Sequence, residues 1–141
     1  MLTQVGKDAL LKMAFQGDNT IIAAGANFYL GLCNQIPVAD DILADITTEP
    51  LVANGYARKA IARNTTGFPT VEIVNGETRI LSLVVDFAAA GGDFSASFNR
   101  AFICSAASGS VGTLFGYSGA YATPILLADG QNQQMKFEFH L

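Results

Sequence analysis

The sequence predicts an all-β protein, an antiparallel β-sandwich or jelly roll preceded by one short N-terminal amphipathic helix. Three observations lead to this prediction. Apolar residues recur at helical spacing over residues 3–15. Beyond residue 18, apolar and polar residues alternate in short runs, as in strands with one buried face. Turn signals rich in Gly and Asn separate these runs at short intervals, which is typical of sandwiches and jelly rolls.

The expected helix is defined by its apolar stripe, which comprises Leu2, Val5, Ala9, Leu10 and Met13. Gly6 weakens this helix, and the run Gly17-Asp18-Asn19 ends it. We therefore expect a single domain with two parts, an N-terminal helix or arm over residues 1–18 and a β-sandwich over residues 19–141.

The expected strands follow from alternation. Phe28, Leu30 and Leu32 mark the first strand, and residues 56–63 form the second. The third is marked by Leu81, Leu83, Val85 and Phe87, and the fourth by Phe98, Phe102 and Cys104. Residues 113–118 and 123–127 are the fifth and sixth. Asn75-Gly76 predicts a hairpin turn between residues 71–74 and 78–87. The last strand is predicted to reach the final residue, with Met135, Phe137, Phe139 and Leu141 on one face and Lys136, Glu138 and His140 on the other.

Composition narrows the function classes. The chain has 141 residues, of which 50% are hydrophobic and only 14% are charged, which favours a subunit that hides surface in a homo-oligomer. A net charge of −4 with scattered cations argues against nucleic-acid binding. No apolar run is long enough for a membrane span, and the N-terminus lacks the pattern of a secretory signal.

The two cysteines, Cys33 and Cys104, lie in strand-like segments, and we interpret both as small buried hydrophobic residues. A disulfide remains an alternative if their two strands are neighbours. We expect no metal site, because there is no Cys-x-x-Cys pair and His140 is the single histidine.

Residues 47–61 form the most distinctive segment. An acidic loop broken by Pro50 ends in Asn54-Gly55, which favours positive backbone angles, and leads into Tyr56-Ala57-Arg58. Two apart in a strand, Tyr56 and Arg58 share a face. They are either a tyrosine packed on the sheet beside an exposed arginine, or an interface pair, since both residue types are enriched at binding hot spots.

Tyr117 and Tyr121, on either side of Gly119, are expected to form a second exposed aromatic patch. Exposed aromatic rings of this kind also suit carbohydrate stacking, so that alternative stays open. Both tyrosines are therefore interface candidates.

The acidic group comprises Asp40, Asp41, Asp45 and Glu49. It lacks the ligand spacing and central glycine of an EF-hand, so a solvated loop is preferred to a calcium site. Asp40 or Asp41 is expected to be the N-cap of a short helical turn over residues 42–45. Asp41, Asp45 and Glu49 are kept as interface candidates.

Signals for catalysis are weak. His140 is expected on the polar face of the last strand, without a local partner to orient it. The small-residue stretch 105–110 is neither a nucleophile elbow nor a phosphate-binding loop. We therefore expect a protein that is not an enzyme and that uses no cofactor.

Several segments together resemble a recurrent type of small virion protein of tailed bacteriophages. The start M-L-T-Q-V-G-K-D-A-L-L is similar to the family's Leu-Thr-x-x-Gly entry into a helix, and residues 27–37, N-F-Y-L-G-L-C-N-Q-I-P, are similar to its first strand. N-G-Y-A-R-K-A-I resembles its Gly-Tyr-Ala-Arg step, and L-F-G-Y-S-G-A with T-P-I-L-L-A-D-G-Q resembles its closing turn. Residues 64–75 match no pattern of the family. Cys33 is a second departure, because the family more usually has a hydroxyl or other small residue at that position.

The resemblance implies a structural virion protein made in the bacterial host cytoplasm. Our first hypothesis is a capsid decoration, or cement, subunit on the outer head surface, which acts as a dimer or trimer that bridges major capsid proteins. The residues expected to reach a neighbour are the helix with residues 19–26, or the acidic loop 40–49. The alternative is a tail or head-fibre module for host recognition that binds carbohydrate.

Overall fold

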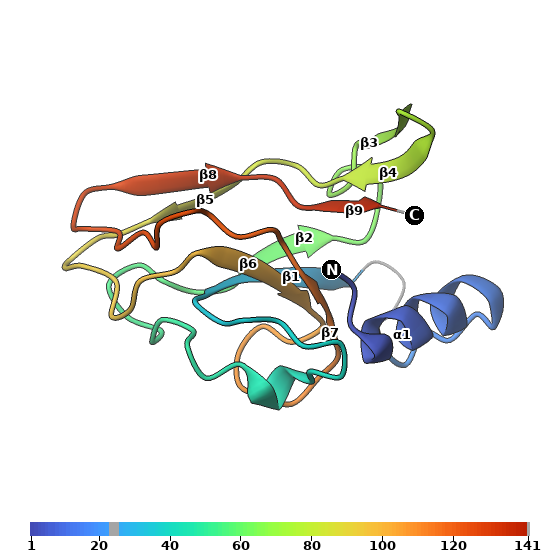
Figure 1. The fold of residues 1–141 in the computed structure, drawn as a ribbon, viewed down its shortest axis with the longest axis horizontal. Helices are drawn as coiled ribbons and strands as arrows, with labels where there is room; N and C mark the ends of the chain where they lie inside the picture. The colour runs from blue at the N-terminus through green and yellow to red at the C-terminus, as the bar shows by residue number, and fades with distance from the viewer. Residues whose placement is uncertain (23–25, 141) are drawn as a thin grey trace.

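The computed structural model describes residues 1–22 and 26–140. Its elements are α1 (Gln4–Phe15), β1 (Asn27–Cys33), the 3-10 helix η1 (Leu43–Asp45), β2 (Lys59–Ala62), β3 (Thr70–Val74), β4 (Glu77–Leu81), β5 (Val85–Ala88), β6 (Arg100–Cys104), β7 (Leu114–Tyr117), β8 (Asn132–Met135) and β9 (Glu138–His140) (Figure 1). All strand pairs in these residues are antiparallel. The predicted all-β class with one short N-terminal helix is thus confirmed.

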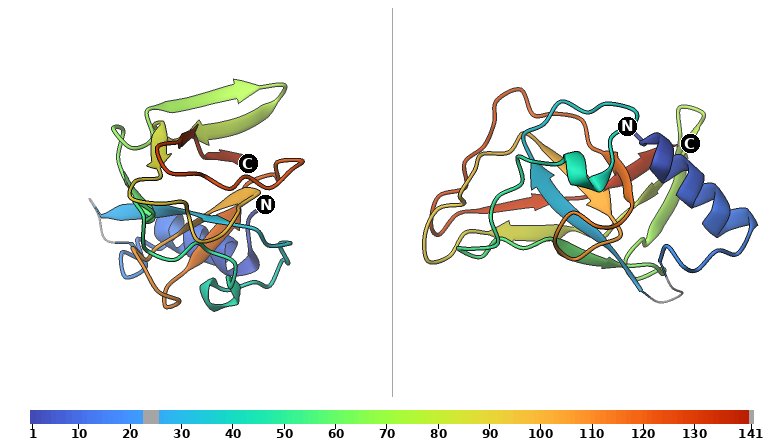
Figure 2. Two further views of the ribbon diagram at one scale, coloured as in Figure 1. Left: turned by 90° about the vertical axis from the view of Figure 1, so that its left-hand side faces the viewer. Right: turned by 90° about the horizontal axis from the view of Figure 1, so that it is seen from below.

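The strands fall into two layers, which the left view of Figure 2 separates clearly. The lower layer is a four-stranded sheet with the order β2-β1-β6-β7. The upper layer is a ribbon in which β3-β4-β9 form one sheet and β5-β8 continue it. The main core lies between the layers, because buried residues of β1, β6 and β7 cluster with buried residues of β5 and β9.

A β-bulge divides the upper ribbon. Leu81 pairs with Glu138, but Val85 pairs with Met135, so three residues of one strand lie opposite two of the other. Ser82 holds the bulge: its backbone N–H donates to the Phe137 carbonyl at 2.9 Å, and its Oγ accepts the Phe137 N–H at 2.8 Å. The bulge splits the predicted strand over residues 78–87 into β4 and β5. It likewise separates β8 from β9, where one strand over residues 135–141 was predicted.

Because of the bulge, the prediction of which side chains of this ribbon face the core is wrong in part. One extra residue moves the side chains that follow it to the opposite face of the sheet. Ile80, rather than Leu81, therefore packs on the core before the bulge, whereas Val85 and Phe87 are buried after it, as expected. On the other strand the predicted alternation is confirmed for Met135, Phe137 and Phe139 toward the core and for Lys136, Glu138 and His140 toward solvent. Leu141 lies outside the described residues.

The remaining strand predictions have mixed outcomes. The first strand and its buried face are confirmed by β1, and Asn75-Gly76 forms the expected hairpin turn with φ values of 54° and 83°. The second strand begins at Lys59 rather than at residue 56. Residues 123–127 do not form a strand; Ile125 makes only an isolated bridge to Phe98.

The helix α1 is part of the domain core. Thr3 caps its first turn by accepting the Gly6 N–H at 3.0 Å, and Ala9 and Met13 are buried in the main core cluster. Gly6 lies so close to Phe115 of β7 that any Cβ would overlap its backbone. Gly6 is therefore required for packing rather than being a weak point.

A second core cluster lies beneath the lower sheet and comprises Cys33, Leu43, Phe102, Cys104, Leu114 and Tyr117. The loops after β1 and after β6 cover it, at the bottom of Figure 1. Both thiols are free and buried, as interpreted from the sequence. Although β1 and β6 are neighbours, Cys33 pairs with Arg100 and Cys104 with Tyr29, which places the two cysteines four residues, or roughly 13 Å, apart along the strands. That separation excludes a disulfide between them.

Candidate functional site

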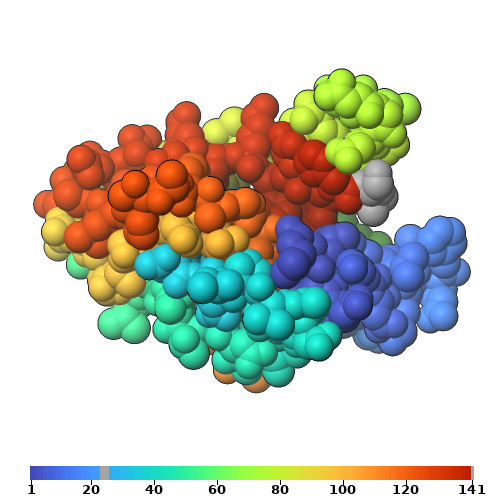
Figure 3. All heavy atoms as spheres, viewed as in Figure 1, coloured from blue at the N-terminus to red at the C-terminus, as the bar shows by residue number. Residues whose placement is uncertain are grey.

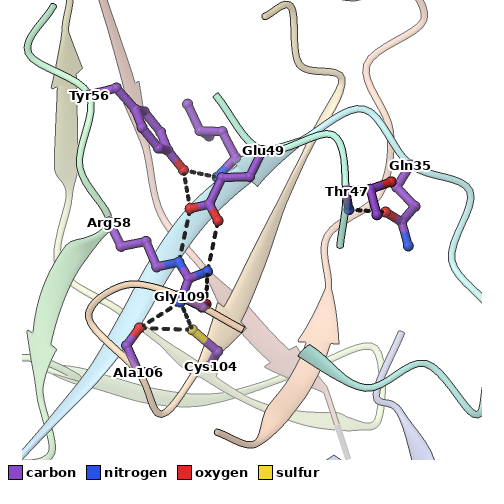
Figure 4. A network of polar contacts seen from close by, with 9 residues as sticks. Gln35, Thr47, Glu49, Tyr56, Arg58, Cys104, Ala106 and Gly109 are labelled. Carbon is purple, nitrogen blue, oxygen red and sulfur yellow. Dashed lines mark hydrogen bonds and ion pairs between the residues drawn. The ribbon is translucent and has the colours of Figure 1, made fainter. Parts of the chain in front are cut away.

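The segment 47–61 builds a buried polar network around Glu49, Tyr56 and Arg58 (Figure 4). The Arg58 Nε and Nη2 donate to the two carboxylate oxygens of Glu49 at 2.9 and 2.7 Å. The Tyr56 hydroxyl donates to the same carboxylate at 2.7 Å and accepts the Leu32 N–H at 3.0 Å. The ion pair between Arg58 and Glu49 is thus bidentate, which is the strong geometry for an arginine and a carboxylate.

The Arg58 guanidinium also contacts the loop that follows β6. The guanidinium donates to the carbonyls of Ala106 at 2.9 Å and Gly109 at 2.8 Å. Its Cζ lies 5.1 Å from the ring centroid of Phe102. Arg58 therefore joins the acidic loop, the lower sheet and the loop 105–112. These segments are distant in sequence.

The electrostatics of this network favour a fixed arrangement. Burial raises the pKa of the Tyr56 hydroxyl, and the Glu49 charge raises it further, so Tyr56 stays a neutral donor. Burial acts to lower the pKa of Arg58, but its hydrogen bond to Glu49 and the neighbouring negative charge raise it overall. The Tyr56 hydroxyl and the Arg58 guanidinium thus donate to partners within the chain, so these residues and Glu49 hold the surrounding segments together. We call Glu49, Tyr56 and Arg58 the clasp.

This geometry changes the interpretation of both residues. Tyr56 is 2% exposed and Arg58 is 9% exposed, so the packed tyrosine of the first alternative is confirmed, whereas its exposed arginine is wrong. Both side chains are engaged by partners within the chain, and through these contacts they hold the neighbouring loops.

A second buried pair joins Tyr117 to the acidic loop. The Tyr117 hydroxyl donates to Asp41 Oδ2 at 2.9 Å, and the same oxygen accepts the Val38 N–H at 2.9 Å. Burial, and then the hydrogen bond to Asp41, raise the pKa of Tyr117. The expected N-cap at Asp40 or Asp41 is wrong, because Ile42 occupies the N-cap position of η1, and its N–H donates to Asp45 at 2.8 Å.

The seven interface candidates thus divide by exposure. Tyr56, Arg58, Tyr117 and Asp41 are buried, Glu49 is partly buried, and Asp45 and Tyr121 are exposed. The structure brings five of them into two polar clusters that hold loops. Asp45 lies near these clusters on η1, whereas Tyr121 lies apart from them, on the turn after β7.

Sequence reasoning missed the apolar surface that these clusters support. We call it the loop surface; it comprises Ile36, Ile42, Leu51, Val52 and Val111, which are 47–88% exposed. The loops that carry it form the lower part of the molecule in Figures 1 and 3. A hollow of about 270 Å³ lies among them, between residues 46–52 and 107–109. The available signal was the position of Leu51-Val52 and Val111 inside turn-rich loops, where polar residues are usual.

A second apolar feature, the helix–hairpin groove, lies between α1 and the β3–β4 hairpin. It has a volume of about 570 Å³. Leu11 and Phe15 line it from the helix, and Val71, Ile80 and Phe139 line it from the sheet. Among these, Phe15 is 83% exposed and Val71 is 66% exposed.

His140 has partners that its sequence position does not reveal. Its Nδ1 lies 3.2 Å from Glu77 and its Nε2 lies 3.1 Å from Glu138, and all three side chains are accessible. Within residues 1–22 and 26–140, no group of three or more His, Cys, Asp or Glu side chains is placed to hold a metal ion. In the same residues, no helix has both the length and the apolarity needed to span a bilayer.

No protein-family model matches the sequence, and a search of curated proteins also finds no match.

Proposed function

We propose that this protein is a non-enzymatic structural subunit that decorates the head of a tailed bacteriophage and stabilises it by bridging major capsid proteins. The observation that supports this proposal is the loop surface, a set of exposed apolar side chains on loops that buried polar pairs hold in place. Apolar side chains exposed together are typical of protein interaction sites. The resemblance noted in the sequence suggests the capsid lattice as the partner.

The clasp explains how loops can serve as a contact surface. Leu51 and Val52 follow Pro50 in the loop that Glu49 anchors, and Val111 lies in the loop that Arg58 holds at Gly109. Holding these loops before binding lowers the conformational entropy lost on association. A subunit that binds only the assembled lattice then stabilises that lattice by mass action, and many equivalent contacts add as avidity.

The experiment is a co-sedimentation assay with heads of the phage that encodes this chain, prepared without it. We expect the unmodified protein to sediment with the heads and Val111→Lys to lose most of this binding. Val84→Lys is the matched control, because Val84 is an exposed valine of the upper ribbon, 47% exposed. Absence of sedimentation by the unmodified protein would refute the proposed location.

Host recognition through carbohydrate is the second outcome of the same test. Sugar stacking needs an accessible ring, and of the tyrosines considered, Tyr121 is 41% exposed whereas Tyr56 and Tyr117 are buried. Glycan-array binding that Tyr121→Ala abolishes, with no binding to heads, would favour the carbohydrate-binding module.

We also propose that the two layers form a β-sandwich, because they bury one shared core. A jelly-roll connectivity is the finer form of this proposal. An experimental structure that shows the order and connections of the strands in both layers tests it.

A further inference from the structure

We propose that two copies of this chain dimerise by pairing their β3 strands edge to edge about a two-fold axis at Glu72, so that the second copy extends the sheet beside the helix–hairpin groove. This surface is separate from the loop surface. The inference therefore does not rest on the proposed binding to capsids.

The first argument is the hydrogen-bonding pattern of β3. In the two-residue hairpin, Val74 and Glu77 flank the turn and form a hydrogen-bonded pair, as does Glu72 with Arg79 two residues on. The N–H and C=O groups of Val71 and Ile73 therefore point away from β4. Because β3 is the outer strand of the described β3-β4-β9 sheet, these groups face its open edge.

The same two residues carry exposed β-branched side chains. Val71 is 66% exposed and Ile73 is 73% exposed, and both lie on the face of the sheet that lines the groove. Proteins usually protect an edge with Lys or Pro on the strand, or with a covering segment. The β7 edge is covered in this way, since the Thr3 N–H donates to Phe115 at 3.0 Å, whereas the sequence T-V-E-I-V of β3 has neither Lys nor Pro.

The β3 edge of one copy can form backbone hydrogen bonds with the β3 edge of a second copy. With the two-fold axis at Glu72, Val71 of one copy lies opposite Ile73 of the other, and each such pair forms two backbone hydrogen bonds. The four outward N–H and C=O groups of each copy are then satisfied. On the groove face, the apolar row Phe139–Ile80–Val71, set by the strand register, continues into Ile73 of the second copy.

Exposed apolar area lies next to the β3 edge. Leu11 and Phe15 of α1 lie along the same groove as Val71 and are 58% and 83% exposed. Together with Val71 and Ile73 they expose roughly 500 Å² per copy, a large part of the about 800 Å² that each partner buries in a standard interface. The paired backbone edges supply further area.

The opposite face of the sheet makes the register testable. There Glu72 lies beside its counterpart in the second copy, and like charges directly opposite are unfavourable. Arg79 offsets part of this repulsion, since its Nη2 lies 2.6 Å from Glu72. We therefore expect Glu72→Gln to tighten the dimer.

The experiment is sedimentation velocity with the full chain, from low micromolar to millimolar concentration. We expect a monomer–dimer equilibrium for the unmodified protein. Ile73→Lys should raise the dissociation constant about tenfold or more, because it places a charge in the apolar row. The matched control is Val111→Lys, an exposed valine of the loop surface, which should leave the equilibrium unchanged.

Hydrogen exchange of the Val71 and Ile73 amides provides a second readout. These amides should gain protection as protein concentration rises, in step with the dimer fraction. A monomer at every concentration would overturn the proposal, as would a dimer that Val111→Lys disrupts and Ile73→Lys does not. Failure of Glu72→Gln to tighten the dimer would overturn the axis at Glu72.

Discussion

Arg58 binds both carboxylate oxygens of Glu49, with its Nε 2.9 Å from one and its Nη2 2.7 Å from the other. The arginine side chain is only 4% exposed and the glutamate side chain 19% exposed. An ion pair with a buried arginine is costly to break, because the remaining charge has lost water as well as its partner. The pair therefore governs how firmly the surrounding loops are held.

We expect Arg58→Met to destabilise the protein by about 3 kcal/mol in urea unfolding. The double variant Arg58→Met with Glu49→Gln should cost less than the sum of the two single variants, because no unpaired buried charge remains in it. Lys12→Met is the control: it breaks the exposed pair with Asp8 on α1 and should leave stability unchanged. Additive effects at Glu49 and Arg58 would contradict the coupling.

The bulge in the upper ribbon depends on Ser82, which is 1% exposed. Ser82→Ala removes the acceptor of the Phe137 N–H and leaves that buried donor unsatisfied. We expect a loss of about 1–3 kcal/mol in the free energy of unfolding and faster hydrogen exchange at Phe137. Ser110→Ala, at an exposed loop position, should change neither quantity.

Gly6 reverses the usual preference for alanine in a helix. Alanine normally stabilises a helix interior by about 1 kcal/mol relative to glycine. Here its Cβ would overlap the Phe115 backbone, so we expect Gly6→Ala to destabilise the protein by about 1–3 kcal/mol in thermal or urea unfolding. Gly119→Ala is the matched control, because open space surrounds that position. A stabilising effect of Gly6→Ala would show that α1 does not pack on β7 as described.

Alkaline conditions should destabilise the fold. Burial raises the pKa of the Cys33 thiol from its usual value of 9.0 to about 12. Between these values the unfolded chain loses the proton and the folded chain keeps it, so the free energy of unfolding falls as pH rises, by up to about 1.4 kcal/mol per pH unit for one group. Below pH 9.0 this contribution to stability is fully present.

Urea unfolding of the reduced protein at pH 8, 9, 10 and 11 measures this slope. We expect Cys33→Ala to unfold with a shallower decline above pH 9 than the unmodified protein. Some decline should remain, because burial also raises the pKa values of Tyr56 and Tyr117. An identical slope in the two proteins would contradict a protonated Cys33 in the folded state.

The parts of the fold that sequence reasoning predicted are those with local causes. The spacing of Ala9 and Met13 predicts the buried side of α1, and Asn75-Gly76 predicts the β3–β4 turn through its backbone preference. The alternation from Met135 to Phe139 predicts which face of the last strands is buried. In each case the deciding interactions lie within a few residues.

The candidate site was predicted only in its location. Residues 47–61 were identified, but with Arg58 either exposed beside a packed Tyr56 or in an interface pair. The buried network was not predicted, because the partners of Arg58 at Ala106 and Gly109 are about fifty residues away. Their proximity depends on how the loops fold over the lower sheet. The loop surface was missed although Leu51, Val52 and Val111 lie in turn-rich loops, because their exposure depends on that folding.

The sequence alone therefore determined the class of the fold, the helix, most strands and the turn residues, because periodicity and backbone preference act over short stretches. Only the tertiary structure decided the bulge at Ser82, the need for glycine at position 6, and the role of Glu49, Tyr56 and Arg58. Each of these depends on a contact between segments far apart in the chain, where burial removes water and makes one hydrogen bond or one Cβ decisive.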